Sequence, residues 1–395
     1  YGNNVTQESV IRNQFEIDEG DPFNEILQNK TVNNLRNLNF FRDVKSEIIN
    51  DDIEKTKTIN ITVEEKPTGE IFAGAGAGTA GTTLSFGIKE NNYLGKGLGL
   101  KADATLTEES FKGSFSVNNP NFMNSDKFVF FNVQATEIDR LTNFGYKTNQ
   151  TGFDVGTGFE YYDDLYFSIS SRNLYESIDA RSNASTRQKK QAGNYFDTFI
   201  GLGFDYDKRN QRYKTTDGFR SNYQVELPII SDTNTLTNAY DYKFYTELYE
   251  DNISSFSLFF KAANSLSGDD IKLSERLYIP FSKLRGFEKG KVGPKDGKDF
   301  IGGNFLSSLN VSTTVPQLLP NSQDIDVSLF FDAANVWGVD YDSSLSDGNK
   351  VRSSIGLAID WFTIIGPMTF SFTEALSKTD SDITESFRFN IGTSF

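Results

Sequence analysis

The residue types that carry out most enzyme chemistry are missing from this sequence. It contains neither histidine nor cysteine, which excludes serine–histidine and cysteine–histidine nucleophiles, histidine acid–base catalysis and almost every zinc or iron site. Hydrolysis by an activated serine or by a carboxylate–histidine pair is excluded for the same reason. We therefore expect no catalytic residue, no metal site and no cofactor, and we predict that the protein is not an enzyme.

Two short motifs match ligand-binding patterns only formally. Residues 76–81 (GAGTAG) fit the pattern G-x-G-x-x-G, but the following segment, TTLSFGIKEN, alternates like a strand and opens no helix that could bind a pyrophosphate. Asp205-Tyr206-Asp207 resembles the start of a calcium-binding loop but lacks the glycine and the later glutamate of that motif. We interpret the aspartates as ordinary polar residues. The glycines belong to a strand with few bulky side chains, which should pair loosely.

Arg285 and Asp332 are charged residues that could form a specific pair. Arg285 lies in an LRGF motif within a long connection, and Asp332 alternates with Leu329 and Phe331, so it should lie on the opposite face of its strand from these apolar residues. A guanidinium away from bulk water favours a bidentate contact with a carboxylate. The residues alone also allow Arg285 to be an ordinary loop arginine.

The composition indicates what kind of structure must position these residues. The net charge of −15 has the wrong sign for a protein that neutralises phosphates, so we expect no nucleic-acid partner. The chain has 36 Phe and 17 Tyr among 395 residues, yet only 37% hydrophobic residues. Many aromatic residues with little average hydrophobicity are typical of strands that show one face to lipid and the other to water. No apolar run reaches about 18 residues, so we expect no transmembrane helix.

Strict two-residue alternation continues through residues 68–395. A soluble β-sandwich or propeller also alternates, but its inward face must fill a core, whereas here that face carries charged and amide residues in strand after strand. Sixteen segments alternate, an even number that suits closure of an antiparallel barrel. They begin near residues 70, 82, 98, 111, 127, 146, 164, 194, 219, 240, 253, 305, 325, 351, 367 and 385. We predict an all-β transmembrane barrel of 16 antiparallel strands, whose longest connection spans about 265–303.

Residues 1–67 read as a separate small α+β module. We expect a first helix that is capped by Thr6 and carries Val10, Ile11 and Phe15. The apolar spacing from Leu27 to Leu38 predicts a second helix. Two alternating strands should follow, with Val44, Ser46 and Ile48 in one and Ile59, Ile61 and Val63 in the other.

Several motifs along the whole chain resemble the BamA family, whose members fold β-barrels into bacterial outer membranes. In the first 66 residues they are GNNVTQESVI, LRNLNFFRDV and INITVEEKP, and they resemble the last periplasmic POTRA module of that family. In the barrel they are LRGF, IGGN, FFDAANVW, GPMTFSF and the terminal FRFNIGTSF. In the POTRA fold an opening strand precedes the first helix. We expect that strand immediately before Gly2, with further modules upstream.

The resemblance assigns roles to the residues of the long connection. It implies that the loop folds into the barrel lumen through its motif Arg285, Gly286 and Phe287, and that Arg285 pairs with Asp332. A second acid of the family corresponds to Ser312 in this chain, so the resemblance implies one carboxylate partner and not two.

The resemblance also implies a function without catalysis. A poorly paired seam between the first and last strands would open sideways and present an edge to which a client strand adds, and Gly392 would let the last strand kink. The implied partners are unfolded outer-membrane β-barrel clients, membrane lipid and accessory lipoproteins that bind the POTRA region. The implied location is the bacterial outer membrane, with the POTRA module in the periplasm. The predicted seam residues are Glu70, Phe72, Gly74, Gly76, Phe389, Ile391, Gly392 and Phe395.

Two other functions remain open at this point. A related transporter would secrete a partner polypeptide through its lumen, and it would have two POTRA modules and a helix that plugs the pore. A passive porin would conduct ions steadily and would need no POTRA module, so the POTRA-like segment argues against it.

Overall fold

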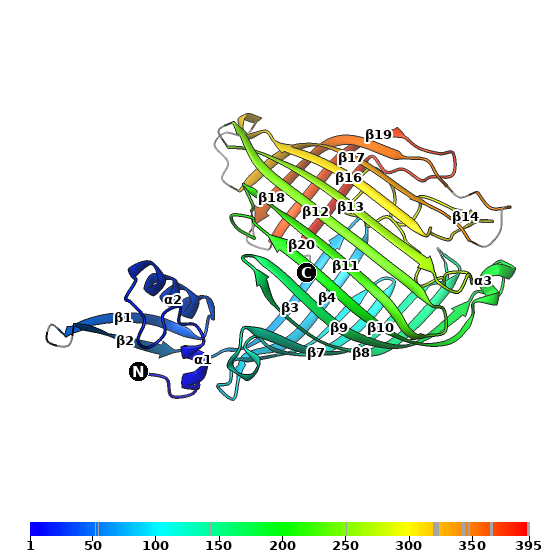
Figure 1. Ribbon diagram of the computed structural model, residues 1–395. Coiled ribbons are helices and arrows are strands. Elements are labelled where there is room, and N and C mark those ends of the chain that lie inside the picture. Colours follow the sequence, from blue (N-terminus) through cyan, green and yellow to red (C-terminus); the bar gives the residue numbers. More distant parts are fainter. Residues whose placement is uncertain are drawn as a thin grey trace.

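The computed structural model describes residues 1–395 except 52, 54, 143, 213, 250, 319–323, 341–343, 347, 364–365 and 393–395. It consists of a small N-terminal module and a large barrel (Figure 1). No helix in the described part of the chain is long and apolar enough to cross a membrane.

The N-terminal module contains helices α1 (Glu8–Arg12) and α2 (Glu25–Asn37) and strands β1 (Phe41–Asp51) and β2 (Thr56–Glu65). The side chain of Asn24 caps α2 by accepting from the backbone N–H groups of Ile26 and Leu27. Tyr1 continues the sheet, because its amino group donates to Ile61 (2.7 Å) and its C=O accepts from Val63 (2.8 Å). The core of the module is Ile11, Val32, Leu35, Phe40, Phe41, Val44, Ile61 and Val63.

The start of the module differs from the sequence prediction. Helix α1 begins after Gln7, which makes no side-chain cap, and ends before Phe15. Thr6 is buried and has other partners: its backbone N–H donates to Glu65 (2.6 Å), and its hydroxyl accepts from Asn92 in the barrel (2.9 Å). The expected cap was wrong because the Thr6 hydroxyl joins the module to the barrel instead.

In the described residues, sixteen antiparallel strands form the closed barrel, each paired with its neighbours along the chain. The ring closes where the last strand pairs with the first. The predicted fold class is confirmed. The strands are β3 (Gly69–Gly78), β4 (Gly81–Tyr93), β5 (Leu98–Thr107), β6 (Ser110–Asn119), β7 (Lys127–Arg140), β8 (Tyr146–Tyr162), β9 (Leu165–Ala180), β10 (Gly193–Asp207), β11 (Gly218–Ser231), β12 (Thr235–Tyr249), β13 (Asn252–Ser265), β16 (Phe305–Thr314), β17 (Ile325–Trp337), β18 (Arg352–Thr363), β19 (Gly366–Ser377) and β20 (Phe387–Gly392).

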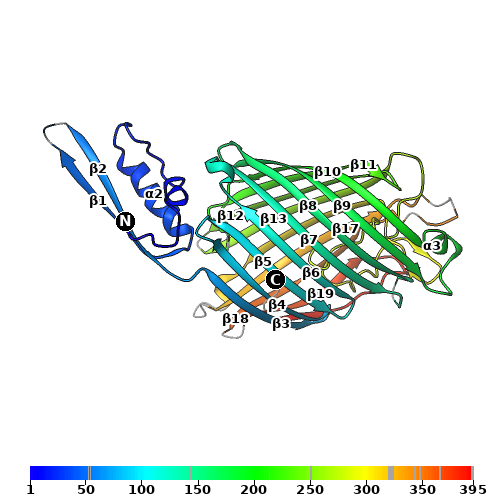
Figure 2. The ribbon, with the colours of Figure 1, turned by 90° about the horizontal axis from the view of Figure 1, so that it is seen from below.

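The two faces of the barrel wall differ as the alternation predicts. On β4, Leu84, Phe86 and Ile88 are each more than half exposed, whereas the intervening Ser85 is buried. Figure 2 shows the strands tilted around the barrel. The exposed apolar rows face outward and the polar rows face the lumen, which is the arrangement that a lipid environment requires.

Short elements occupy the end of the barrel far from the module, called the far end below (Figure 1). They are α3 (Thr186–Lys190), β14 (Lys295–Asp296) and β15 (Asp299–Phe300). None of them was predicted, because elements of two to five residues leave no periodicity to detect. Two single-turn 3-10 helices, Phe122–Asn124 and Pro316–Leu318, complete the described elements.

The connection between β13 and β16, residues 266–304, is called the inward loop below. Several of its apolar side chains are buried against the barrel wall, so the far end of the lumen has a core of its own. That core contains Ile271, Leu277, Ile279, Leu284, Phe287 and Val292 of the inward loop together with Ala263, Leu306, Ala334 and Val336 of the wall.

Candidate functional site: the seam and the inward loop

The first and last strands meet along a short ladder, called the seam below. Among the described residues, three Cα pairs join β20 to β3, from Asn390 opposite Gly78 to Gly392 opposite Gly76. One further backbone bond runs from the Thr79 N–H to the Phe389 C=O (3.0 Å). The next ladder, between β3 and β4, aligns ten pairs. In the described residues, the seam is therefore the shorter of the two ladders that β3 forms.

Glycine allows the two backbones to approach at the seam. Gly392 has a φ of +105°, and a Cβ there would lie 2.3 Å from the Ala75 C=O oxygen. A Cβ on Gly78 would lie 2.5 Å from the Phe389 C=O oxygen. Contacts this short would force the strands apart, so these positions accept no side chain without a shift. Backbone hydrogen bonds join the two strands in the described part of the seam.

The structure places the predicted seam residues in two groups. Gly76, Ile391 and Gly392 lie in the ladder itself, and Phe389 contributes its backbone oxygen. The others face β4 instead: Glu70 forms an ion pair with Lys89 (3.0 Å), Phe72 lies opposite Gly87, and Gly74 lies opposite Ser85. Phe395 lies outside the described residues.

The structure brings Arg285 and Asp332 together. The Arg285 side chain donates twice to the carboxylate, from Nε to Oδ2 (2.7 Å) and from Nη2 to Oδ1 (2.8 Å), and its backbone N–H donates to Oδ2 (3.0 Å). Asp332 is fully buried, and the guanidinium lies 3.4 Å from the ring centroid of Phe330. The pair is charge-assisted, bidentate and shielded from water, the combination that fixes geometry most firmly.

The remaining motif residues support this pair through the backbone. Gly286 has a φ of +85°, and a Cβ there would lie 2.6 Å from the Thr373 methyl group. The Arg285 C=O accepts from the Ser354 hydroxyl (2.6 Å), and Phe287 is buried in the core of the far end. The turn at glycine thus directs the arginine into the wall and the phenylalanine into the core.

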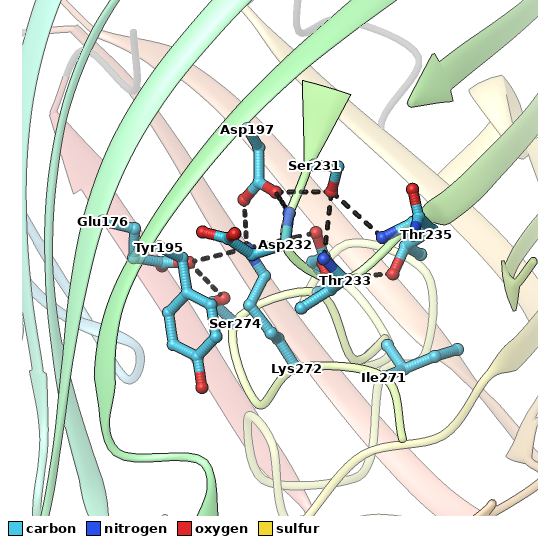
Figure 3. Close-up of polar contacts among 12 residues, drawn as sticks. Glu176, Tyr195, Asp197, Ser231, Asp232, Thr233, Thr235, Ile271, Lys272 and Ser274 are labelled. Atoms are coloured by element: carbon cyan, nitrogen blue, oxygen red, sulfur yellow. Dashed lines mark hydrogen bonds and ion pairs between the residues drawn. The ribbon is translucent and has the colours of Figure 1, made fainter. Parts of the chain in front are cut away.

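A second anchor of the inward loop surrounds Lys272, which is 3% exposed (Figure 3). Its Nζ lies 2.5 Å from Asp197 on β10, 3.3 Å from Glu176 on β9 and 3.4 Å from Glu275 of the loop itself. The ring of Tyr195 lies 5.0 Å from the ammonium. Burial opposes the charge of Lys272, but the three carboxylates outweigh that effect and raise its pKa above the ordinary value.

The carboxylates of this anchor are themselves held in place. Asp197 accepts from the Ser231 hydroxyl (2.5 Å), and Glu275 accepts from the Thr235 hydroxyl (2.6 Å). Burial raises the pKa of Glu275, although Lys272 and the Thr235 hydroxyl act against that rise. Residues of β9, β10, β11 and β12 therefore converge, directly or through a carboxylate, on one loop lysine.

Comparison with known proteins decides the family. A model of the Omp85 superfamily domain matches residues 92–395, and a POTRA model, described as a surface antigen variable number repeat, matches residues 1–66. This chain belongs to the Omp85 superfamily.

The Omp85 chain is similar to BamA proteins over its whole length. The outer membrane protein assembly factor BamA of Neorickettsia risticii is 24% identical over 404 residues, which cover 100% of this chain and 54% of that protein. The crystal structure of BamA from Haemophilus ducreyi lacking POTRA domains 1-3 has a TM-score of 0.87 at 22% identity, covering 100% of this chain and 83% of that one. These matches confirm the resemblance to the BamA family.

A more distant fold neighbour of the Omp85 chain is CdiB from Acinetobacter baumannii. Its TM-score is 0.61 at 13% identity, and the match covers 98% of this chain and 72% of that one. The chain spans about half the length of the curated relatives it matches.

Sequence reasoning missed two parts of this Omp85 site. Asn310, opposite Asp332 in the ladder between β16 and β17, donates to the carboxylate (2.9 Å) and also to the Lys283 C=O (2.8 Å). Ser312, which corresponds to the second family acid, lies one alternation further along the strand, opposite Phe330. The side-chain amide of Asn310 therefore provides the second polar contact of Asp332, beside that of Arg285. The Lys272 anchor was missed too, although inward-facing acids at the far ends of β9 and β10 were a usable signal.

Proposed function

We propose that this Omp85 protein is an assembly factor that folds and inserts β-barrel proteins into the bacterial outer membrane. The barrel lies in that membrane and the POTRA module, residues 1–67, lies in the periplasm. The seam between β3 and β20 opens sideways and acts as a lateral gate. The observation that supports this proposal most is the contrast between three paired residues at the seam and ten in the adjacent ladder, among the described residues.

Hydrogen bonding explains why an open edge would promote insertion. In hydrocarbon, each unsatisfied backbone N–H or C=O costs several kcal/mol. A client strand that pairs with the β3 edge satisfies these groups before it meets lipid. The step breaks no covalent bond, so it requires no catalytic residue. The partners are unfolded β-barrel clients and the lipid around the apolar outer face.

The composition of β3 suits a template for many clients. From Ala73 to Gly78 the strand carries only alanine and glycine, so it offers backbone groups with few side chains that could clash with a client. A template that binds mainly through its backbone tolerates varied sequences, because every client strand has the same backbone donors and acceptors.

We assign the inward loop a supporting role in this function. The Arg285–Asp332 pair holds the loop against β17 inside the lumen and so fixes the position of the loop relative to the barrel wall. Accessory lipoproteins of the assembly machinery bind the POTRA region. A transporter that secretes a polypeptide through its lumen is the less supported alternative, because the far end of the lumen is filled by the buried core of the inward loop.

A disulfide across the seam tests the proposal. Ala77 and Ile391 are directly opposite each other, and residues 1–395 contain no cysteine, so Ala77→Cys with Ile391→Cys introduces the only thiols of this part of the protein. In lipid vesicles that contain the full-length protein, the oxidised variant should insert an unfolded β-barrel client at least about tenfold more slowly, because the edge is covered. Reduction should restore insertion, which is measured by the shift of the folded client on an unheated gel.

A matched disulfide separates seam closure from general stiffening. Ala75 and Leu84 are opposite each other between β3 and β4, so Ala75→Cys with Leu84→Cys links β3 to its permanent neighbour. This variant should insert clients at the wild-type rate under both conditions. Normal insertion by the oxidised seam variant would rule out the lateral gate.

A further inference from the structure

The side chain of Arg388, on the last strand, is bound to the inward loop. It is buried, with 6% of its surface exposed, and its Nη1 donates to the Phe281 C=O (2.6 Å). Its Nη2 donates to the C=O groups of Phe287 (2.8 Å) and Leu284 (3.4 Å), and its Nε donates to Glu385 (2.6 Å). The guanidinium also lies 3.4 Å from the ring centroid of Phe281. One side chain of β20 thus holds three carbonyls of the loop.

The chain just before β20 is bound to the same part of the loop through the backbone. Glu288 N–H donates to the Ile383 C=O (2.9 Å), Ile383 N–H donates to the Lys291 C=O (3.1 Å), and Glu385 N–H donates to the Gly286 C=O (3.1 Å). The approach to β20 is therefore joined to the loop at the glycine turn and directly after it.

The inward loop can hold β20 firmly because its other end is bound to the wall opposite the seam. Lys272 is bound to β9 and β10. Around the ring, β10 and β20 are separated by β11, β12, β13, β16, β17, β18 and β19, which places them half a circumference apart. The inward loop therefore crosses the lumen from the wall opposite the seam to the last strand of the seam.

We propose that Arg388 is a positioning residue that ties β20 to the inward loop and so sets the orientation of the β20 edge at the seam. Its part in client insertion rests on the proposed function. Arginine suits this task because its planar guanidinium offers five donors in fixed directions, enough for several carbonyls and a carboxylate at once. A lysine at this position would keep the charge but could not reproduce the fork of hydrogen bonds.

Without this tie, β20 would be held by β19, by the short seam and by the backbone bonds of Ile383 and Glu385 to the inward loop. β20 should then separate from β3 more often, and its backbone amides should exchange with solvent faster. Loss of several hydrogen bonds from a charged group should raise the exchange rate about tenfold or more.

Hydrogen–deuterium exchange on the full-length protein in lipid bilayers, with no client present, tests the proposal. In Arg388→Gln, the peptides that contain β20 and the facing part of β3 should exchange about tenfold faster than in the wild type. Arg388→Lys should give an intermediate rate. Arg276→Gln is the matched control, because Arg276 is also a buried arginine that contacts Asn304 and Asp340 but lies away from β20. It should leave both peptides at the wild-type rate.

Three outcomes would overturn the assignment. They are wild-type exchange of β20 in Arg388→Gln, an equal increase in Arg276→Gln, and full restoration by Arg388→Lys, which would show that charge alone suffices. If Arg388→Gln does not fold, Arg388→Lys decides the question, since it must still exchange faster than the wild type. The seam disulfide tests the function separately: normal insertion with a locked seam would end the proposed function and leave the exchange result unaffected.

Discussion

The seam and the wall around β7 and β8, called the β8 wall below, differ more in what covers their glycines than in how many they have. In the β8 wall, Gly156 and Gly158 on β8 lie directly across from Phe130 and Phe128 on β7. A Cβ on either glycine would meet a phenyl ring at 2.5–2.6 Å, so each ring already occupies that space. At the seam, Gly76 lies opposite Gly392, and neither glycine has a ring over it among the described residues.

The lengths of the strand ladders differ between the two regions in the same sense. The β8–β9 ladder runs from Tyr146 opposite Ala180 to Tyr162 opposite Leu165, which is far longer than the described seam. A glycine weakens a strand through its conformational freedom and its missing side chain, but an aromatic neighbour can supply the missing packing. The comparison therefore teaches that a glycine-rich strand is weak only where its partner also lacks bulk.

The largest expected effect concerns the loop anchor on the seam side of the barrel. Arg285→Ala leaves the fully buried Asp332 without its bidentate partner, which should cost about 3–5 kcal/mol of loop stability. Lys283→Ala is the matched change, because Lys283 pairs with the partly exposed Asp241 (3.1 Å) and should cost about 1 kcal/mol or less. Limited proteolysis of residues 266–304 in bilayer-embedded protein should cut the first variant much faster. Equal cleavage of the two variants would remove the special role of Arg285.

Alternation in the sequence was enough to predict the strands and their faces, including the inward position of Asp332. The largest error in a strand start was β12, which begins at Thr235 and was expected near residue 240. Its first five residues, TLTNA, include a single large apolar side chain, so the alternation there gives little signal.

Contacts between strands needed information that alternation does not contain. Asn310 meets Asp332 because of the register between β16 and β17, and a shift of one residue would turn one of them outward. The Lys272 anchor depends further on how a loop of nearly forty residues folds. The residues alone offered the pairing of Arg285 with Asp332 as one possibility, and the family resemblance selected it, since many acids face the lumen.

A smaller effect should follow from uncovering a glycine in the β8 wall. Phe130→Ala removes the ring that covers Gly156, which should make this part of the wall more like the seam and destabilise it by about 1–2 kcal/mol. Phe131→Ala is the matched control, because Phe131 is the next residue and points outward, with 39% of its surface exposed. In lipid bilayers, hydrogen exchange of the β7 and β8 peptides should rise in the first variant and change less in the second. Identical exchange in both would show that ring cover does not explain the difference between the walls.

The smallest effect should be a difference in how the two regions respond to acid. On the seam side, Asp382 in the connection between β19 and β20 pairs with Arg352 (3.0 Å). Burial opposes the charge of Asp382, but Arg352 and the Thr379 N–H outweigh it and lower its pKa. At the Lys272 anchor of the inward loop, burial raises the pKa of Glu275. A lowered pKa means that the folded state binds the proton more weakly than the unfolded state, and a raised pKa means the reverse.

As the pH falls, protonation of Asp382 therefore destabilises the folded state, whereas protonation of Glu275 stabilises it. The stabilisation from Asp382 is complete above its ordinary pKa of about 3.9 and is lost as the pH falls through that value towards the lowered one. The stabilisation from Glu275 is complete below about 4.3 and is lost as the pH rises through its raised pKa. Between pH 5 and pH 3, exchange corrected for its intrinsic pH dependence should increase in residues 378–386 and not in residues 270–276. Asp382→Asn should abolish the increase, because the variant has no proton to gain there. A similar increase in that variant would assign the response to another group.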